Sequence, residues 1–159
     1  MALAMTTPRP RLVLDTNVCL DLFVFRDPHA AALADALASG RVEAVSDADC
    51  RDEWQRVLAY PQLGLEAQTQ AQALRAYDAV VRVLADSERR PPPERALPRC
   101  ADPDDQKFLE LAHAADASCL LSRDHALTVL GRRNARAGLF EIMTPQAWAG
   151  VDAFRSARA

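Results

Sequence analysis

The sequence predicts an α/β fold, a three-layer α/β/α sandwich around a central, mainly parallel sheet of four to five short strands. Two observations predict it. Short apolar runs typical of buried strands alternate with longer segments whose apolar residues recur at helical spacing. This alternation favours parallel strands covered by helices on both faces. The 159 residues contain no internal repeat and fit one domain with a single core.

The elements follow in order along the chain. The predicted strands are short apolar runs bounded by polar or turn-forming residues, and they cover residues 11–15, 42–45, 118–122 and 139–143. The predicted helices have apolar residues at helical spacing, and they cover residues 18–25, 28–38, 48–59, 65–85, 103–115, 124–130 and 144–148. Pro28 and Gly40 are typical start and stop signals, and Ser46 with Asp49 resembles a capping arrangement. Residues 87–99, with three consecutive prolines, form a predicted loop.

The domain organisation expected from these segments is simple. Residues 1–10 form a flexible N-terminal leader without the apolar core of a signal peptide, residues 11–150 form the domain, and residues 151–159 form a C-terminal tail. No apolar run approaches the ~20 residues of a membrane-spanning helix. The four cysteines form no zinc-ligand pattern, so we expect buried free thiols in a reducing cytoplasm.

The net charge of −3 argues against a protein that binds nucleic acid mainly through an overall positive charge. It leaves room for a protein that binds phosphates through metal ions and a local arginine patch.

Four acids are placed where they could meet. Asp15 comes directly after one strand and Asp124 two residues after another, and the carboxyl ends of parallel strands share one edge of a sheet. Asp105 lies in the first turn of its helix and Glu53 inside another. Clustered carboxylates repel one another unless a cation is present, and Mg²⁺ and Mn²⁺ prefer oxygen ligands. The sequence therefore contains a candidate metal site.

Each acid also has a simpler interpretation. Asp15 and Asp124 could be turn formers or helix caps, and Glu53 could face water. Asp102 and Asp104 are possible additional acids of the site, although both are well explained as residues that start a helix. The three histidines are scattered, and no Ser-His-Asp or Cys-His arrangement competes with the carboxylates.

The segments that carry these acids resemble the motifs of PIN domains. Residues 12–18 (LVLDTNV) resemble the opening strand with its first aspartate, and residues 102–112 (DPDDQKFLELA) resemble the helix of the third acid. Residues 120–124 (LLSRD) are similar to the strand end that presents the fourth acid, and Glu53 matches the middle glutamate. Residues 141–148 resemble the last strand and helix of one bacterial branch, formed by toxins of type II toxin–antitoxin pairs.

This resemblance implies a ribonuclease that uses Mg²⁺ or Mn²⁺ to activate water against a phosphodiester of RNA. It also implies a cognate antitoxin that holds the enzyme inactive, and a homodimer. The implied catalytic residues are Asp15, Glu53, Asp105 and Asp124, of which the three aspartates bind metal and Glu53 binds metal or orients a water. The residues implied to hold these carboxylates by hydrogen bonds are Thr16, Asn17 and Ser122.

RNA needs positive charge beside the acids. The candidate RNA contacts after the last acid are Arg123, Arg132, Arg133 and Arg136, and further arginines lie in the proline-rich loop. The simpler interpretation is that they are solvated surface residues.

Two other functions are compatible with parts of the pattern. A PIN-like domain could serve as a catalytically silent scaffold that binds RNA or protein. A phosphatase of the haloacid dehalogenase type also begins with a strand and an aspartate, but it needs a second aspartate where this chain has Asn17.

Overall fold

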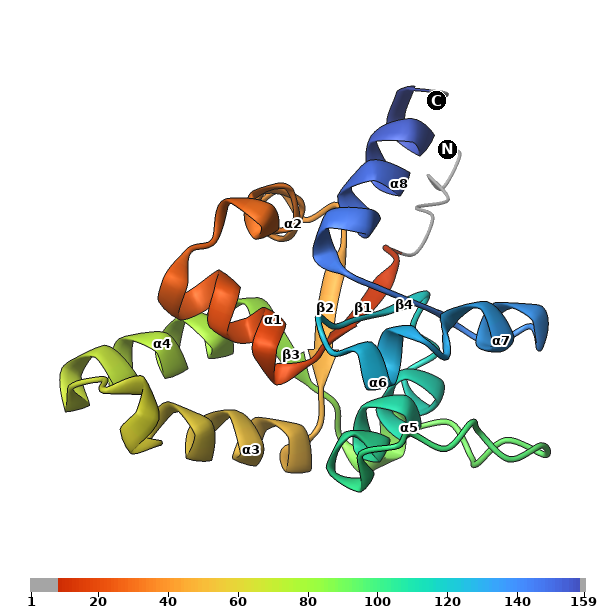
Figure 1. Ribbon diagram of the computed structural model, residues 1–159, viewed down its shortest axis with the longest axis horizontal. Helices are drawn as coiled ribbons and strands as arrows, with labels where there is room; N and C mark the ends of the chain where they lie inside the picture. Colours follow the sequence, from red (N-terminus) through yellow and green to blue (C-terminus); the bar gives the residue numbers. More distant parts are fainter. Residues whose placement is uncertain (1–8, 158–159) are drawn as a thin grey trace, which may run out of the picture.

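The computed structural model describes residues 9–157 and contains one five-stranded sheet (Figure 1). Its strands are all parallel and lie in the order β3-β2-β1-β4-β5. Their bounds are Arg11–Leu14 for β1, Glu43–Ser46 for β2, Val81–Val83 for β3, Cys119–Leu121 for β4 and Glu141–Met143 for β5. The predicted fold class, a parallel sheet of four to five short strands, is confirmed.

Helices connect and cover the strands. Their bounds are Thr16–Leu20 for α1, Ala31–Ala38 for α2, Ala48–Leu58 for α3, Ala67–Val80 for α4, Gln106–Ala114 for α5, His125–Thr128 for α6, Gly131–Arg136 for α7 and Pro145–Ala157 for α8. A π-helical segment, η1 (Asp21–Phe25), continues α1. The single 3₁₀ turns are η2 (Pro28–Ala30), η3 (Pro61–Leu63), η4 (Asp86–Glu88) and η5 (Pro103–Asp105).

Alternate residues of the central strand enter two separate cores. Leu12 and Leu14 pack on one face of the sheet with residues of α1, α2, α3, α4 and α8, whereas Val13 packs on the other face with residues of α5 and α6. This is the alternation that the pleat of a strand imposes. Because both faces are covered by helices, β1 is apolar throughout its buried length, and the three-layer arrangement follows.

The predicted helix over residues 65–85 is wrong at its C-terminal end. Helix α4 stops at Val80, and the chain continues directly as the edge strand β3, which pairs with β2. No glycine or proline marks this change. The local signal is three valines within four residues, Val80, Val81 and Val83, which favour an extended backbone.

Two further segments differ from expectation. Helix α7 has no apolar stripe and was not predicted; its buried residue is Asn134, whose Nδ2 donates a hydrogen bond to the Phe140 carbonyl at 2.8 Å. Helix α8 continues to Ala157, so the boundary placed at residue 150 falls inside a helix and residues 151–157 are not a separate tail. The leader expected over residues 1–10 lies mostly outside the described residues.

The start of α3 is also capped differently from the prediction. Asp47, rather than Ser46, is the N-cap residue, and its Oδ1 accepts a hydrogen bond from the Cys50 N–H at 2.9 Å. An aspartate at this position satisfies a free N–H group of the first turn and interacts well with the helix dipole.

Candidate metal centre at the carboxyl edge of the sheet

Asp15 is held rigidly at the end of β1. Its N–H donates to the Leu121 carbonyl at 2.9 Å, which continues the ladder to β4, and its side chain caps α1. Oδ1 accepts from the Thr16 N–H at 2.7 Å, and Oδ2 accepts from Ser122 Oγ at 2.6 Å and Asn17 Nδ2 at 3.2 Å. Burial raises the pKa of Asp15, while the Ser122 and Thr16 donors oppose that rise. The structure therefore places all three predicted supporting residues around this carboxylate.

Asp124 lies at the end of the neighbouring strand, where it caps α6. Its Oδ1 accepts from the Ala126 N–H at 2.9 Å, and its own N–H donates to Ser122 Oγ at 2.9 Å. The buried Ser122 hydroxyl therefore links the two strand-end aspartates directly. This arrangement follows from the pairing of β1 with β4 in parallel register.

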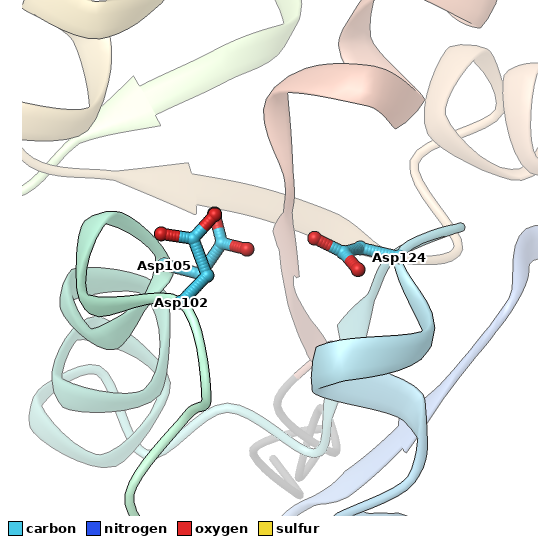
Figure 2. A group of neighbouring side chains, drawn as sticks. All are labelled: Asp102, Asp105 and Asp124. Carbon is cyan, nitrogen blue, oxygen red and sulfur yellow. The ribbon is translucent and has the colours of Figure 1, made fainter.

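Asp102 and Asp105 face Asp124 from the start of α5 (Figure 2). One carboxylate oxygen from each of these three residues lies within 4.8 Å of the other two. Asp102 also accepts a hydrogen bond from the Asp104 N–H at 3.0 Å, so it both caps the turn and joins the acids. Asp104 is exposed and is not part of this group, which we call the three-aspartate group.

The electrostatics of Asp105 are unusual. Its Oδ2 atom is buried and has no hydrogen-bond partner among the described residues. Burial, a hydrogen bond that only the protonated form can give to Asp124, and the negative charges of Asp15 and Asp102 together raise the pKa of Asp105 to about 8. A divalent cation would relieve this repulsion with its own charge and accept the unpartnered oxygen as a ligand, so these residues fit such an ion.

Glu53 does not join the three-aspartate group. Its Oε1 accepts from Lys107 Nζ at 2.6 Å, and its Oε2 accepts from Thr16 Oγ1. Burial lowers the pKa of Lys107, but the hydrogen bond and the charge of Glu53 outweigh that effect and raise it. The ammonium group therefore stays charged and compensates Glu53.

Sequence reasoning gave Lys107 no role in a nuclease site. Two signals point to it: it is the only lysine beside 18 arginines, and it stands in the first turn of a helix, where the dipole disfavours a cation. Neither signal identifies Glu53 as its partner, because that contact joins residues 54 positions apart.

The arginines divide into paired and unpaired groups. Arg123 forms an ion pair with the buried Asp21, in which its Nε lies 2.6 Å from Asp21 Oδ2, and the Arg123 side chain is half exposed. Arg132, Arg133 and Arg136 lie on α7, and no ion pair is formed by them within residues 9–157. Arg133 lines a pocket with Arg95 and Arg99 of the proline-rich loop, and no acid is among the residues that line it.

The parallel sheet, the helices on both of its faces and the acids at its carboxyl edge define an α/β domain with a carboxylate site of the kind that binds divalent metals. The family model for the PIN domain matches residues 11–126, from β1 to the start of α6. The chain belongs to the PIN domain family, whose members are generally nucleases. No curated protein matches the sequence. Over the part that the structure describes, no helix is long and apolar enough to cross a membrane.

Proposed function

We propose that this protein is a metal-dependent ribonuclease that hydrolyses phosphodiesters of RNA. The observation that carries the proposal is the three-aspartate group, in which a buried oxygen of Asp105 has no partner and the acid has a raised pKa. A protein gains nothing in stability from gathering unpaired carboxylates, so such a cluster favours a functional explanation.

The ligands of a Mg²⁺ or Mn²⁺ ion would be Asp105 and Asp124, with Asp102 at the exposed side and Asp15 behind them. When bound, the ion would lower the pKa of a water molecule and neutralise charge on the phosphate. The Ser122 hydroxyl would keep the strand-end aspartates in fixed positions, because it bonds to the side chain of Asp15 and to the backbone of Asp124.

RNA as the substrate is supported by the arginines near this edge. The segment that leads from Arg99 to Asp102 packs beside α6, where Cys100 Sγ lies 3.6 Å from the Ala126 carbonyl. Arg133 of α7 lines one pocket with Arg95 and Arg99, and Arg99 lies three residues before Asp102 in the sequence, so these unpaired arginines suit the phosphates of a single strand that approaches the acids. Arg123 uses its Nε in the pair with Asp21, and its remaining guanidinium N–H groups would be available to a phosphate.

The proposed biological role is the toxin of a type II toxin–antitoxin pair, with a cognate antitoxin and a homodimeric, cytoplasmic enzyme. This role is supported by the likeness of residues 141–148 to the bacterial toxin branch. Purification alone and with a co-expressed neighbouring gene product, followed by light scattering, tests both the partner and the dimer.

Cleavage of a mixed RNA substrate tests the enzymatic proposal. We expect cleavage with Mn²⁺, none with EDTA, and loss of activity in Asp15→Asn. The control is Asp104→Asn, which removes an exposed acid in the turn before α5, beside the three-aspartate group, and should keep its activity. If folded protein cleaves no RNA and gains no thermal stability from Mn²⁺, the nuclease proposal is refuted and a silent binding scaffold is favoured.

A further inference from the structure

The ammonium group of Lys107 belongs to the acid network. Lys107 Nζ donates to Glu53 Oε1 at 2.6 Å, Thr16 Oγ1 donates to Glu53 Oε2, and the Thr16 N–H donates to Asp15 Oδ1 at 2.7 Å. Ser122 continues this chain of hydrogen bonds to Asp124. One fixed cation is therefore connected, through four intervening residues, to the backbone N–H of Asp124, one member of the three-aspartate group.

The position of Lys107 on its helix is unusual for a cation, although its Nζ also lies 5.6 Å from the centre of the Phe108 ring. It stands in the first turn of α5, where backbone N–H groups and the helix dipole favour acids over cations. Its side chain is only 26% exposed, and that of Glu53 only 17%. A surface lysine would extend into solvent, whereas this one is held against a partly buried glutamate.

Each oxygen of Glu53 already accepts a hydrogen bond, and its charge is already compensated. A divalent ion at Glu53 would have to displace the ammonium group and would be repelled by it. The three-aspartate group has no such internal cation. No ion pair within residues 9–157 involves Asp102, Asp105 or Asp124. The three-aspartate group therefore needs a cation to compensate its charge, whereas Glu53 already has one.

We propose that Lys107 takes the place of a second divalent cation, so that the protein binds one metal ion, at the three-aspartate group, and Glu53 is the partner of Lys107 rather than a metal ligand. This inference rests on the proposed metal-dependent function. An ammonium group has three N–H donors, and only Glu53 accepts from it among the described residues. The other donors would be available to a phosphate oxygen of the substrate.

Mn²⁺ titration of the purified protein tests this inference. Free Mn²⁺ is followed by electron paramagnetic resonance and heat by calorimetry, in the wild type and in variants whose folding is checked by circular dichroism. We expect one bound Mn²⁺ in the wild type and in Glu53→Gln, with affinities within about threefold of each other, and a loss of roughly tenfold or more in Asp105→Asn.

The lysine variants give the decisive comparison. Lys107→Met should bind a second Mn²⁺ at the freed Glu53, the double variant Lys107→Met/Glu53→Gln should bind one again, and Lys107→Arg should bind one because it keeps the charge. Two ions in the wild type, or no ion in Glu53→Gln, would overturn the inference.

The outcome is separable from that of the proposed function because the measurement is binding and not cleavage. One bound Mn²⁺ without RNA cleavage would contradict the proposed nuclease activity but support the inference that the protein binds a single metal ion. Cleavage with two bound ions would support the nuclease activity but contradict the inference that Lys107 replaces a second ion.

Discussion

Replacing Asp105 by asparagine should stabilise the metal-free protein. In the folded chain the pKa of Asp105 is raised from 3.8 to about 8, so the folded state holds a proton that the unfolded state releases. The contribution of Asp105 to stability therefore falls as the pH rises from about 4 to about 8, and it is least favourable above that range. Asparagine carries no charge and its amide can donate to Asp124, so the variant escapes this loss.

The magnitude follows from the geometry. Unit charges 4.8 Å apart repel by roughly 3.5 kcal/mol at an effective dielectric constant of about 20. The full difference between 3.8 and about 8 corresponds to at most ~6 kcal/mol. Solvent and counterions screen this partly exposed group, so we expect a gain of about 1–3 kcal/mol. For a domain of this size the midpoint of unfolding should rise by roughly 3–8 °C.

Thermal unfolding in EDTA at pH 6, 7.5 and 9 measures the effect. The gain in Asp105→Asn should increase with pH, and Asp104→Asn should show no comparable increase. Addition of Mn²⁺ should stabilise the wild type and the control but much less the Asp105 variant, which lacks a ligand. A variant less stable than the wild type in EDTA at pH 9 would refute the electrostatic reasoning.

Three other substitutions test separate parts of the structure. Ser122→Ala removes a donor from the buried Asp15 and should lower the free energy of unfolding by about 1–3 kcal/mol in urea titrations; an unchanged stability would contradict the role of that hydrogen bond. Gly131→Ala places a methyl group 2.6 Å from the Ile142 carbonyl oxygen and should lower the free energy of unfolding by about 1–3 kcal/mol. The midpoint of thermal unfolding should fall while Mn²⁺ binding is unchanged. An unchanged midpoint would show that α7 can move away from this carbonyl. Arg133→Gln should weaken binding of single-stranded RNA in EDTA and make the slope of log K against log salt less steep by about 0.7; an unchanged slope would remove this arginine from the phosphate path.

The parts of the site that follow strands were predictable from the sequence. A buried apolar run followed by a polar residue fixes both the strand and the edge at which the next side chain lies, which is why Asp15 and Asp124 were placed together. The order β2-β1-β4 then brings the two strands side by side. Helix starts are also recognisable locally, and Asp102 was correctly interpreted as the cap of its turn.

The parts that depend on packing between distant segments were not predictable. Asp102 turned out to be both a cap and a member of the three-aspartate group, because the same carboxylate can do both when the turn faces Asp124. The family pattern groups Glu53 with the metal ligands, whereas the structure pairs it with Lys107. The edge strand β3 was not predicted because three residues are too few to show the alternation of apolar and polar residues that is typical of a strand.

The directions of the hydrogen bonds explain why Asp105 is the acid whose negative charge is least compensated. The single hydroxyl hydrogen of Ser122 is given to Asp15, so this residue cannot also donate to the carboxylate of Asp124. The carboxylates of Asp15 and Asp124 both accept hydrogen bonds from backbone N–H groups at helix starts. Oδ2 of Asp105 accepts no hydrogen bond among the described residues, and the pKa of this acid is raised to about 8. A bound divalent ion would supply the positive charge that Asp105 lacks, so binding of the ion would release the proton that the raised pKa of Asp105 retains.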